Sequence, residues 1–296
     1  MNDLVQRCGY VALIGRPNAG KSTLLNRLIG EKIAAVSNKP QTTRTRIQGV
    51  VTSPQGQIVF VDTPGVHKPG HRLNKRMMHT VLDTLQNVDL VMLLRDATVA
   101  SGHGEQYALE LVRQSGQKAI LALNKVDALP RKDLLLPLID WYRKQHDFLE
   151  VVPISALKGE AIDLLVDLTF RYLPEGRPIY DEETLTDASL RSIAAEMVRE
   201  KILQSTEQEL PFATAVACEH WEETDQLARI FCAIYVERKS QRAIVLGKAG
   251  KKIRQIGIEA RRDIERLIGK QVYLELFVKV HEHWRDDETT LNLLGV

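Results

Sequence analysis

The chain has 296 residues, 44% hydrophobic and 26% charged, with a formal net charge of +2, which fits a folded protein of about two domains and excludes disordered, collagen-like and coiled-coil chains. No uncharged apolar run approaches the roughly 18–20 residues that span a bilayer, and residues 1–7 lack the apolar core of a signal peptide, so neither feature is predicted. Three cysteines, Cys8, Cys218 and Cys232, are too few and too scattered for a disulfide framework or a zinc site, which favours a cytosolic protein.

The first half of the chain alternates short apolar runs with helical stretches, which is the pattern of an α/β domain. Two of the apolar runs contain almost no polar residue, as expected of strands buried on both faces of a doubly wound, mostly parallel sheet. The predicted strands are residues 10–14, 47–51, 58–62, 89–94, 119–123 and 150–154. The predicted helices are residues 22–28, 72–85, 105–114, 134–146 and 161–171.

A phosphate-binding loop of the form G-x-x-x-x-G-K-[ST] follows the first predicted strand and opens the first helix. This context fits the chemistry, because loop amides and a helix N-terminus point N–H groups at phosphate oxygens. Lys21 is predicted to reach the β- and γ-phosphates, and the Ser22 hydroxyl to hold Mg²⁺. The predicted nucleotide-binding residues of this loop are Gly15, Arg16, Pro17, Asn18, Ala19, Gly20, Lys21, Ser22 and Thr23.

A second motif, D-x-x-G, ends the third predicted strand with Asp62 and Gly65. A carboxylate at the tip of a strand can meet Mg²⁺ directly or through water. Gly65 lets its backbone N–H approach the γ-phosphate closely, because it has no side chain. Alone, this motif predicts only a turn; after a phosphate-binding loop it predicts part of a nucleotide site.

The residues predicted to contact the base follow the next two strands. One carboxylate, that of Asp127, can accept hydrogen bonds from both N1 and N2 of guanine, whereas adenine offers no matching pair of donors. Adenine would leave the carboxylate unpaired, at a cost of about 1–3 kcal/mol or more. An amide from Ala156 can reach guanine O6. We therefore predict a guanine site formed by Asn124, Lys125, Asp127, Ser155 and Ala156.

The composition changes between residues 173 and 185, where two prolines, a glycine and several acidic residues are typical of a linker. We predict domains at residues 1–175 and 187–296, joined by residues 176–186. Asp187 is the predicted N-cap of the next helix, whose apolar residues follow helical spacing. Beyond it, the pattern predicts strands at 212–217, 230–237 and 272–280, and a helix at 253–268.

The net charge conceals an asymmetry: the first 180 residues hold 23 basic and 17 acidic side chains, and the remainder hold 17 and 21. Within the acidic half, residues 247–270 hold eight basic and three acidic side chains. Such a segment can bind a phosphate backbone, although by charge alone a solvated helix face is its commoner meaning.

This basic segment begins with a G-x-x-G loop. In KH domains such a loop clamps the backbone of about four nucleotides, and the lysines neutralise phosphate charge. One local conflict exists, because residues 243–246 have strand propensity whereas a KH domain requires a short helix there. The predicted RNA-binding residues are Gly247, Lys248, Ala249, Gly250, Lys251, Lys252, Ile253 and Arg254.

The nucleotide motifs together resemble those of the Ras-like translation-factor GTPases. This resemblance implies a switch threonine, Thr42 or Thr43 with Thr43 preferred, that closes on Mg²⁺ and the γ-phosphate and releases on hydrolysis. It makes Ser22, Thr43 and Asp62 the Mg²⁺ ligands, and gives Lys21, Thr43 and Gly65 catalytic roles.

Two positions bear on the rate of hydrolysis. Val66 stands where Ras-like enzymes carry a water-orienting glutamine, so we expect slow intrinsic turnover. Asn18 resembles the asparagine that binds K⁺ in potassium-dependent members of the superfamily. Stimulation of the GTPase by K⁺ is therefore a hypothesis, with Asn18 as the K⁺ ligand.

A GTPase domain with Q-T-T-R and D-T-P-G, followed by a KH domain, resembles the Era family of bacterial ribosome-assembly GTPases over nearly the whole chain. The resemblance implies an α/β P-loop GTPase domain and a smaller α+β KH domain of type II. It also implies GTP or GDP and Mg²⁺ as cofactors, and binding of 16S rRNA near its 3′ end during assembly of the 30S subunit or its precursor. It further implies a cytoplasmic monomer, with the peripheral inner-membrane contact of some family members.

We expect Mg²⁺-GTP to order residues 37–46 and 62–75 and so to alter how the KH domain meets rRNA. Two alternatives remain open at this point. One is a GTPase-regulated factor that modifies or processes RNA. The other is a signalling or trafficking GTPase whose C-terminal domain binds protein.

Overall fold

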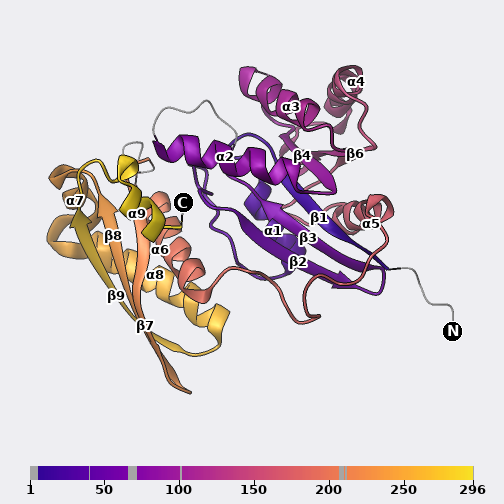
Figure 1. Cartoon of the computed structure of the whole chain (residues 1–296). Coiled ribbons are helices and arrows are strands. Elements are labelled where there is room, and N and C mark those ends of the chain that lie inside the picture. The colour runs from indigo at the N-terminus through magenta and orange to yellow at the C-terminus, as the bar shows by residue number, and fades with distance from the viewer. Residues whose placement is uncertain are drawn as a thin grey trace. The chain divides into compact units, whose positions relative to one another are not determined.

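The computed structural model describes residues 6–39, 41–65, 72–100, 102–206, 210 and 212–295. The chain forms two compact units (Figure 1). The first unit consists of Met1–Gly30, Thr43–Lys68 and Met77–Asp187, and the second of Glu31–Thr42, Pro69–Arg76 and Ala188–Val296. Segment 31–42, which lies between the first helix and the switch threonine, thus belongs to the second unit.

The first unit is built on a six-stranded sheet of order β2-β3-β1-β4-β5-β6. All neighbouring strands are parallel except β2 and β3. The strands are β1 (Arg7–Ile14), β2 (Ile47–Ser53), β3 (Gly56–Asp62), β4 (Leu90–Asp96), β5 (Ala119–Asn124) and β6 (Glu150–Pro153). The helices are α1 (Lys21–Ile29), α2 (Arg72–Gln86), α3 (His103–Ser115), α4 (Leu135–Gln145) and α5 (Ile162–Tyr172).

Helices cover both faces of this sheet. Alternate residues of β1, Ala12 and Ile14, join a buried cluster with residues of α2, α3 and α4. On the other side, α1 packs on β2 and β3, and α5 packs on β1. All six residues of β5 are buried, as are Leu90–Leu94 of β4, because both strands lie inside the sheet. The doubly wound, mostly parallel fold predicted from the sequence is confirmed.

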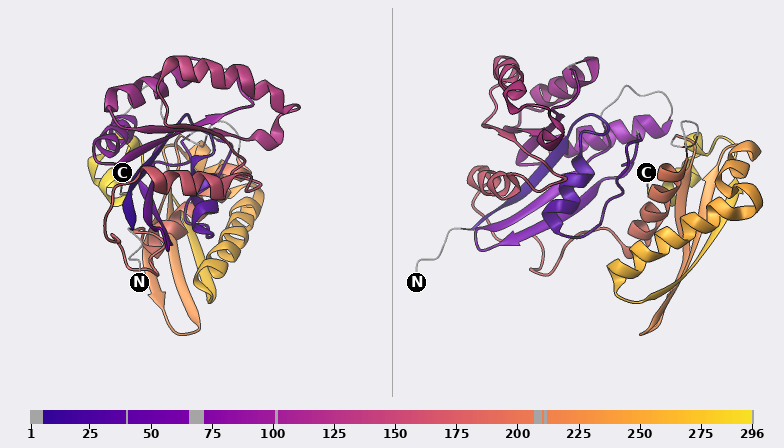
Figure 2. Two further views of the ribbon diagram at one scale, coloured as in Figure 1. Left: turned by 90° about the vertical axis from the view of Figure 1, so that its right-hand side faces the viewer. Right: turned by 180° about the vertical axis from the view of Figure 1, so that it is seen from behind.

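The second unit contains a three-stranded sheet of order β7-β8-β9, in which β8 is antiparallel to β7 and parallel to β9. Helices α6 and α8 contact each other and pack on the sheet, and Figure 2 shows them from two further sides. The α+β fold predicted for this part is confirmed. Its elements are α6 (Leu190–Ser205), β7 (Ala215–Glu223), β8 (Leu227–Val236), α7 (Lys239–Leu246), α8 (Lys251–Ile268), β9 (Gln271–Val280) and α9 (Glu288–Leu293).

Three local predictions need correction or resolution. The N-cap of α6 is Ser189, whose side chain accepts a hydrogen bond from the Ser192 amide; Asp187 instead accepts one from the Gln48 amide at 3.3 Å. Both residue types cap helices well, so the sequence D-A-S-L left the choice to packing. Strand β7 begins at Ala215, three residues later than predicted, and runs on to Glu223. Residues 243–246 are helical, as a KH domain requires.

Among the described residues, no helix combines the length and the apolar character needed to cross a membrane.

Candidate nucleotide and RNA sites

The phosphate-binding loop joins β1 to α1, and the side chain of Lys21 is buried within it. Lys21 Nζ donates to the carbonyl oxygens of Gly15 at 3.2 Å and Arg16 at 3.3 Å. Burial lowers the pKa of Lys21, and the nearby Asp62 carboxylate opposes this shift. The ammonium group is therefore held inside the loop in a place where additional negative charge would stabilise it.

Three oxygen-bearing side chains meet beside this loop. The Ser22 Oγ lies 2.8 Å from Thr43 Oγ1 and donates to Asp62 Oδ2 at 2.7 Å. The Thr43 hydroxyl also lies 3.3 Å from Asp62 Oδ2. Asp62 is fully buried, and its Oδ1 has no hydrogen-bond partner among the described residues. Hydroxyl and carboxylate oxygens with one unsatisfied acceptor suit Mg²⁺, a hard cation that prefers oxygen ligands.

The two switch threonines lie in different surroundings. Thr43 joins Ser22 and Asp62, whereas the Thr42 hydroxyl bonds the Lys39 carbonyl at 2.7 Å and lies 2.9 Å from Ser37 Oγ. The structure therefore brings Thr43, and not Thr42, to the oxygen cluster. Burial raises the pKa of Asp62, while Lys21, Ser22 and Thr43 lower it.

The predicted base-contacting residues lie at the carboxyl ends of β5 and β6. Asn124 ties them to the phosphate loop, because its Nδ2 donates to the Ala19 carbonyl at 2.8 Å and its Oδ1 accepts from the Ala156 amide at 3.0 Å. Ser155 Oγ donates to Asp127 Oδ1 at 2.6 Å. This bond holds one oxygen of the carboxylate in place, and Asp127 is exposed. Gly65 is buried near Pro17, while Val66 lies outside the described residues.

Lys125, the remaining member of the predicted guanine site, acts on a different partner. Its Nζ donates to Asp96 Oδ2 at 2.6 Å, which connects the end of β5 with the end of β4. The loop and base motifs are thus brought together at one edge of the sheet, as expected for parallel strands whose carboxyl ends meet there.

In the second unit, the predicted RNA-binding residues form the turn between α7 and α8 and the first turn of α8. Gly247 and Gly250 have φ angles of 69° and 72°, in the left-handed region that glycine adopts at low cost. The side chains of Lys248, Lys251 and Arg254 are exposed, and that of Lys252 is half-buried. The loop therefore presents positive charge next to backbone that a phosphate can approach closely.

A groove of about 1280 Å³ continues from this turn between α8 and β9. It is lined partly by the predicted residues Ile253 and Arg254. Sequence reasoning missed its other walls, because a half-buried strand and the far turns of a helix carry no motif. Two signals lay in the sequence: the basic segment 247–270, which includes Arg261, and a glycine inside α8, which costs about 1 kcal/mol in a helix interior. The missed lining residues include Gly257, Ile258, Arg261, Tyr273, Leu274, Glu275 and Leu276.

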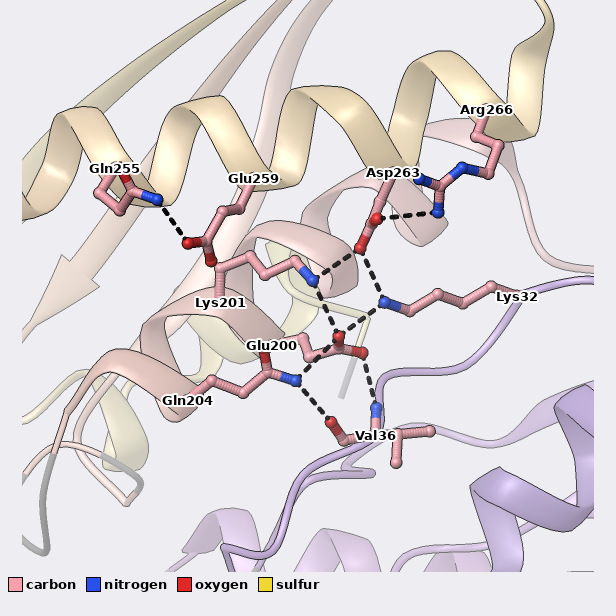
Figure 3. A network of polar contacts seen from close by, with 9 residues as sticks. All are labelled: Lys32, Val36, Glu200, Lys201, Gln204, Gln255, Glu259, Asp263 and Arg266. Atoms are coloured by element: carbon pink, nitrogen blue, oxygen red, sulfur yellow. Dashed lines mark hydrogen bonds and ion pairs between the residues drawn. The ribbon is translucent and has the colours of Figure 1, made fainter. Parts of the chain in front are cut away.

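Segment 31–42 is fixed to α6 and α8 by charged side chains (Figure 3). Lys32 Nζ lies 2.6 Å from Glu200 Oε1 and 2.8 Å from Asp263 Oδ2, and Lys201 Nζ lies 2.7 Å from the same Asp263 oxygen. Glu200 is 2% exposed and also accepts the Val36 amide at 2.8 Å. Breaking a buried pair of this kind is costly, because it strands a charge in the interior.

A second contact holds the end of the same segment. The Arg199 guanidinium, 1% exposed, donates to the carbonyl of Gln41 at 3.3 Å and also to that of Thr42. Thr43, the next residue, lies with Ser22 and Asp62 in the first unit. Sequence reasoning did not identify Glu200, Asp263 or Arg199, because charged residues in helices usually face water and no motif marks these three.

Comparison with known proteins gives concordant results for both parts of the chain. Residues 10–125 match a family model described as 50S ribosome-binding GTPase, and residues 209–285 match the KH domain model. The chain is 44% identical over 290 residues to GTPase Era of Staphylococcus haemolyticus (strain JCSC1435), covering 98% of this chain and 97% of that protein.

Two solved structures resemble this one over 98% of its length and 99% of theirs, each with a TM-score of 0.94 and 38% identity. One is the crystal structure of an Aquifex aeolicus Era variant bound to GDP and AlF₄⁻. The other is the crystal structure of Era in complex with MgGDPNP and nucleotides 1506–1542 of 16S ribosomal RNA.

Proposed function

The chain belongs to the Era family of GTPases, and we propose that it is a GTP-hydrolysing switch that binds 16S rRNA near its 3′ end and acts in 30S subunit assembly. The observation that carries the proposal is that one chain joins the Ser22–Thr43–Asp62 oxygen cluster to a KH fold with a basic G-x-x-G loop and a groove. We include in the proposal a cytoplasmic monomer with peripheral contact to the inner membrane. We also retain the domain limits 1–175 and 187–296, with residues 176–186 as linker.

The nucleotide roles follow from where the side chains lie. Residues 15–23 would hold the phosphates, with Lys21 moving from the loop carbonyls to the phosphate charge. Ser22, Thr43 and Asp62 would hold Mg²⁺, which when bound neutralises charge on the phosphates. The Gly65 amide would face the γ-phosphate. Guanine would be held by Asn124, Lys125, Asp127, Ser155 and Ala156.

The RNA role rests on the turn and groove of the second unit. The backbone of Gly247–Gly250 would contact phosphates, while Lys248, Lys251 and Lys252 neutralise them. Bases would then enter the groove between α8 and β9, where apolar walls allow stacking and Arg261 supplies a donor. Sequence-specific reading of single-stranded RNA requires such contacts to splayed bases.

We propose slow hydrolysis that K⁺ stimulates through Asn18. Asn18 lies in the loop with φ at 65°, a conformation that asparagine tolerates better than most residues. Turnover of GTP at fixed Mg²⁺ is expected to be at least about fivefold faster in KCl than in NaCl, because a cation there would offset charge developing between the phosphates. Asn18→Gly removes the side-chain oxygen without straining the backbone, and should abolish the difference. Equal rates in the two salts would refute the K⁺ site.

The switch model predicts that RNA affinity depends on the nucleotide. Because Thr43 directly follows a segment anchored by Glu200 and Arg199, movement of Thr43 would act on α6 and α8. An RNA with the 3′-terminal sequence of 16S rRNA is expected to bind roughly fivefold or more tightly with a GTP analogue than with GDP. Fluorescence anisotropy at fixed salt measures both affinities and tests the proposed function.

A variant of Glu200, which anchors segment 31–42, separates the effect of the nucleotide on RNA affinity from RNA binding itself. Glu200→Gln should bring the ratio of the two RNA affinities below about twofold while leaving GDP affinity unchanged, because it weakens the bond to Lys32 and Val36. Glu259→Gln serves as the control, since Glu259 bonds Gln255 within its own helix. RNA affinities that are the same with both nucleotides in the unmodified protein would remove the switch model, whereas absence of RNA binding would remove the RNA role.

A further inference from the structure

We propose that Glu105 is a positioning residue for the phosphate-binding loop and acts through Arg16; this rests on the proposed nucleotide-binding function. Glu105 lies in the first turn of α3 and is 5% exposed. Its two carboxylate oxygens lie 2.8 and 2.7 Å from Arg16 Nη1. Arg95 Nη1 lies 3.4 Å from Oε1. One buried carboxylate therefore joins two arginines, one of them in the loop.

The carboxylate of Glu105 is itself held from two sides. Its Oε2 accepts the Gly102 amide at 3.2 Å at the start of α3. Arg95, at 2% exposure, is fixed at the end of β4, because its Nη2 donates to the Val99 carbonyl at 2.5 Å and its Nη1 to the Asp96 carbonyl. Glu105 is thus held by contacts from α3 and β4 in addition to those from Arg16.

The anchored residue, Arg16, determines the turn of the loop. Its carbonyl accepts both the Ala19 amide at 3.2 Å and Lys21 Nζ at 3.3 Å. The Arg16 side chain is held by a buried carboxylate, and this contact also fixes the position of the Arg16 backbone. The Arg16 carbonyl can then accept the hydrogen bonds that form the turn of the loop and hold Lys21. Loop amides bind phosphate well only if they are already aimed at it, since binding energy is otherwise spent on ordering them.

Gly104 supports the same assignment independently. A Cβ at this position would lie 2.6 Å from Arg16 Nε and 2.9 Å from its Cδ. The guanidinium is thus packed directly against the backbone of α3, and only glycine leaves it that space. The Gly104→Ala variant retains the Glu105 carboxylate but must displace Arg16.

The test is a double-mutant cycle on GDP affinity. Dissociation constants for a fluorescent GDP are measured for the full chain, Glu105→Gln, Arg16→Met and the double variant. Glu105→Gln and Arg16→Met should each weaken binding about tenfold, and the double variant should be no weaker than Arg16→Met alone. Glu110→Gln, on the same helix but exposed, should bind GDP like the unmodified chain.

The outcomes distinguish this proposal from its premise. If Glu105→Gln costs as much in the Arg16→Met background as alone, Glu105 acts on general stability and the proposal is wrong. Unchanged affinity in Glu105→Gln also overturns it. Should the buried substitution prevent folding, Gly104→Ala replaces it: about tenfold weaker GDP binding supports the proposal, and unchanged binding refutes it. Failure of the unmodified chain to bind GDP would instead overturn the proposed function.

Discussion

Replacing Asp127 with asparagine is expected to lower the affinity for GDP and GTP by about 100-fold or more and to create binding of xanthine nucleotides. The Asp127 carboxylate is held by the Ser155 hydroxyl at 2.6 Å, so it presents a fixed pair of acceptors. Guanine offers two adjacent donors to such a pair. Asparagine replaces one acceptor with an N–H group, which faces a guanine donor but can bond the carbonyl that xanthine carries at the same place.

Competition between fluorescent GDP and unlabelled GDP or XDP measures this change. Asp133→Asn provides the control, because Asp133 is exposed and pairs only with Arg131 at 3.4 Å among the described contacts. It should bind GDP like the unmodified chain. GDP affinity in Asp127→Asn that matches the unmodified chain would show that the base is not read by this carboxylate.

The nucleotide site could be predicted from the sequence because each of its parts is a short motif next to a strand. The backbone of residues 15–22 and the turn after Asp62 need only local continuity, and parallel strands then bring their ends to one edge. The α/β fold could also be predicted, because β4 and β5 are apolar at nearly every position, as expected of strands buried on both faces of a sheet. The structure adds that Thr43, rather than Thr42, lies with Ser22 and Asp62.

The buried charged residues that hold segment 31–42 and the phosphate-binding loop could not be predicted from the sequence, because their roles depend on burial. Glu105, Glu200 and Asp263 lie in helices where a charged residue usually faces water, and no motif marks the partners that are distant in sequence. Lys32 and Glu200 are separated by 168 residues, so only tertiary packing pairs them. At residues 243–246 local strand propensity conflicted with the helix that a KH domain requires, and the structure has the helix, because tertiary packing overrides a weak local preference.

The second large effect is expected in RNA binding, for the variant Gly250→Asp. No atom lies within 4 Å of the position that a Cβ would occupy at Gly250, and aspartate tolerates the φ of 72° better than most residues. The turn should therefore persist, with a carboxylate placed among Lys248, Lys251 and Lys252. Repulsion from phosphates should weaken binding of the 16S 3′-terminal RNA about tenfold or more at moderate salt, and less at high salt.

Gly247 is a poorer site for the same experiment, because a Cβ there would lie 2.6 Å from that of Lys252 and the loop itself would have to move. Gly250→Asn is the matched control: it has nearly the shape of aspartate without its charge, and should cost no more than about twofold in RNA affinity. GDP affinity should be unchanged in both variants. Equal losses in the two would mean that the side chain's size, not its charge, disturbs binding. Full RNA affinity in Gly250→Asp would mean that RNA does not approach the protein through this loop.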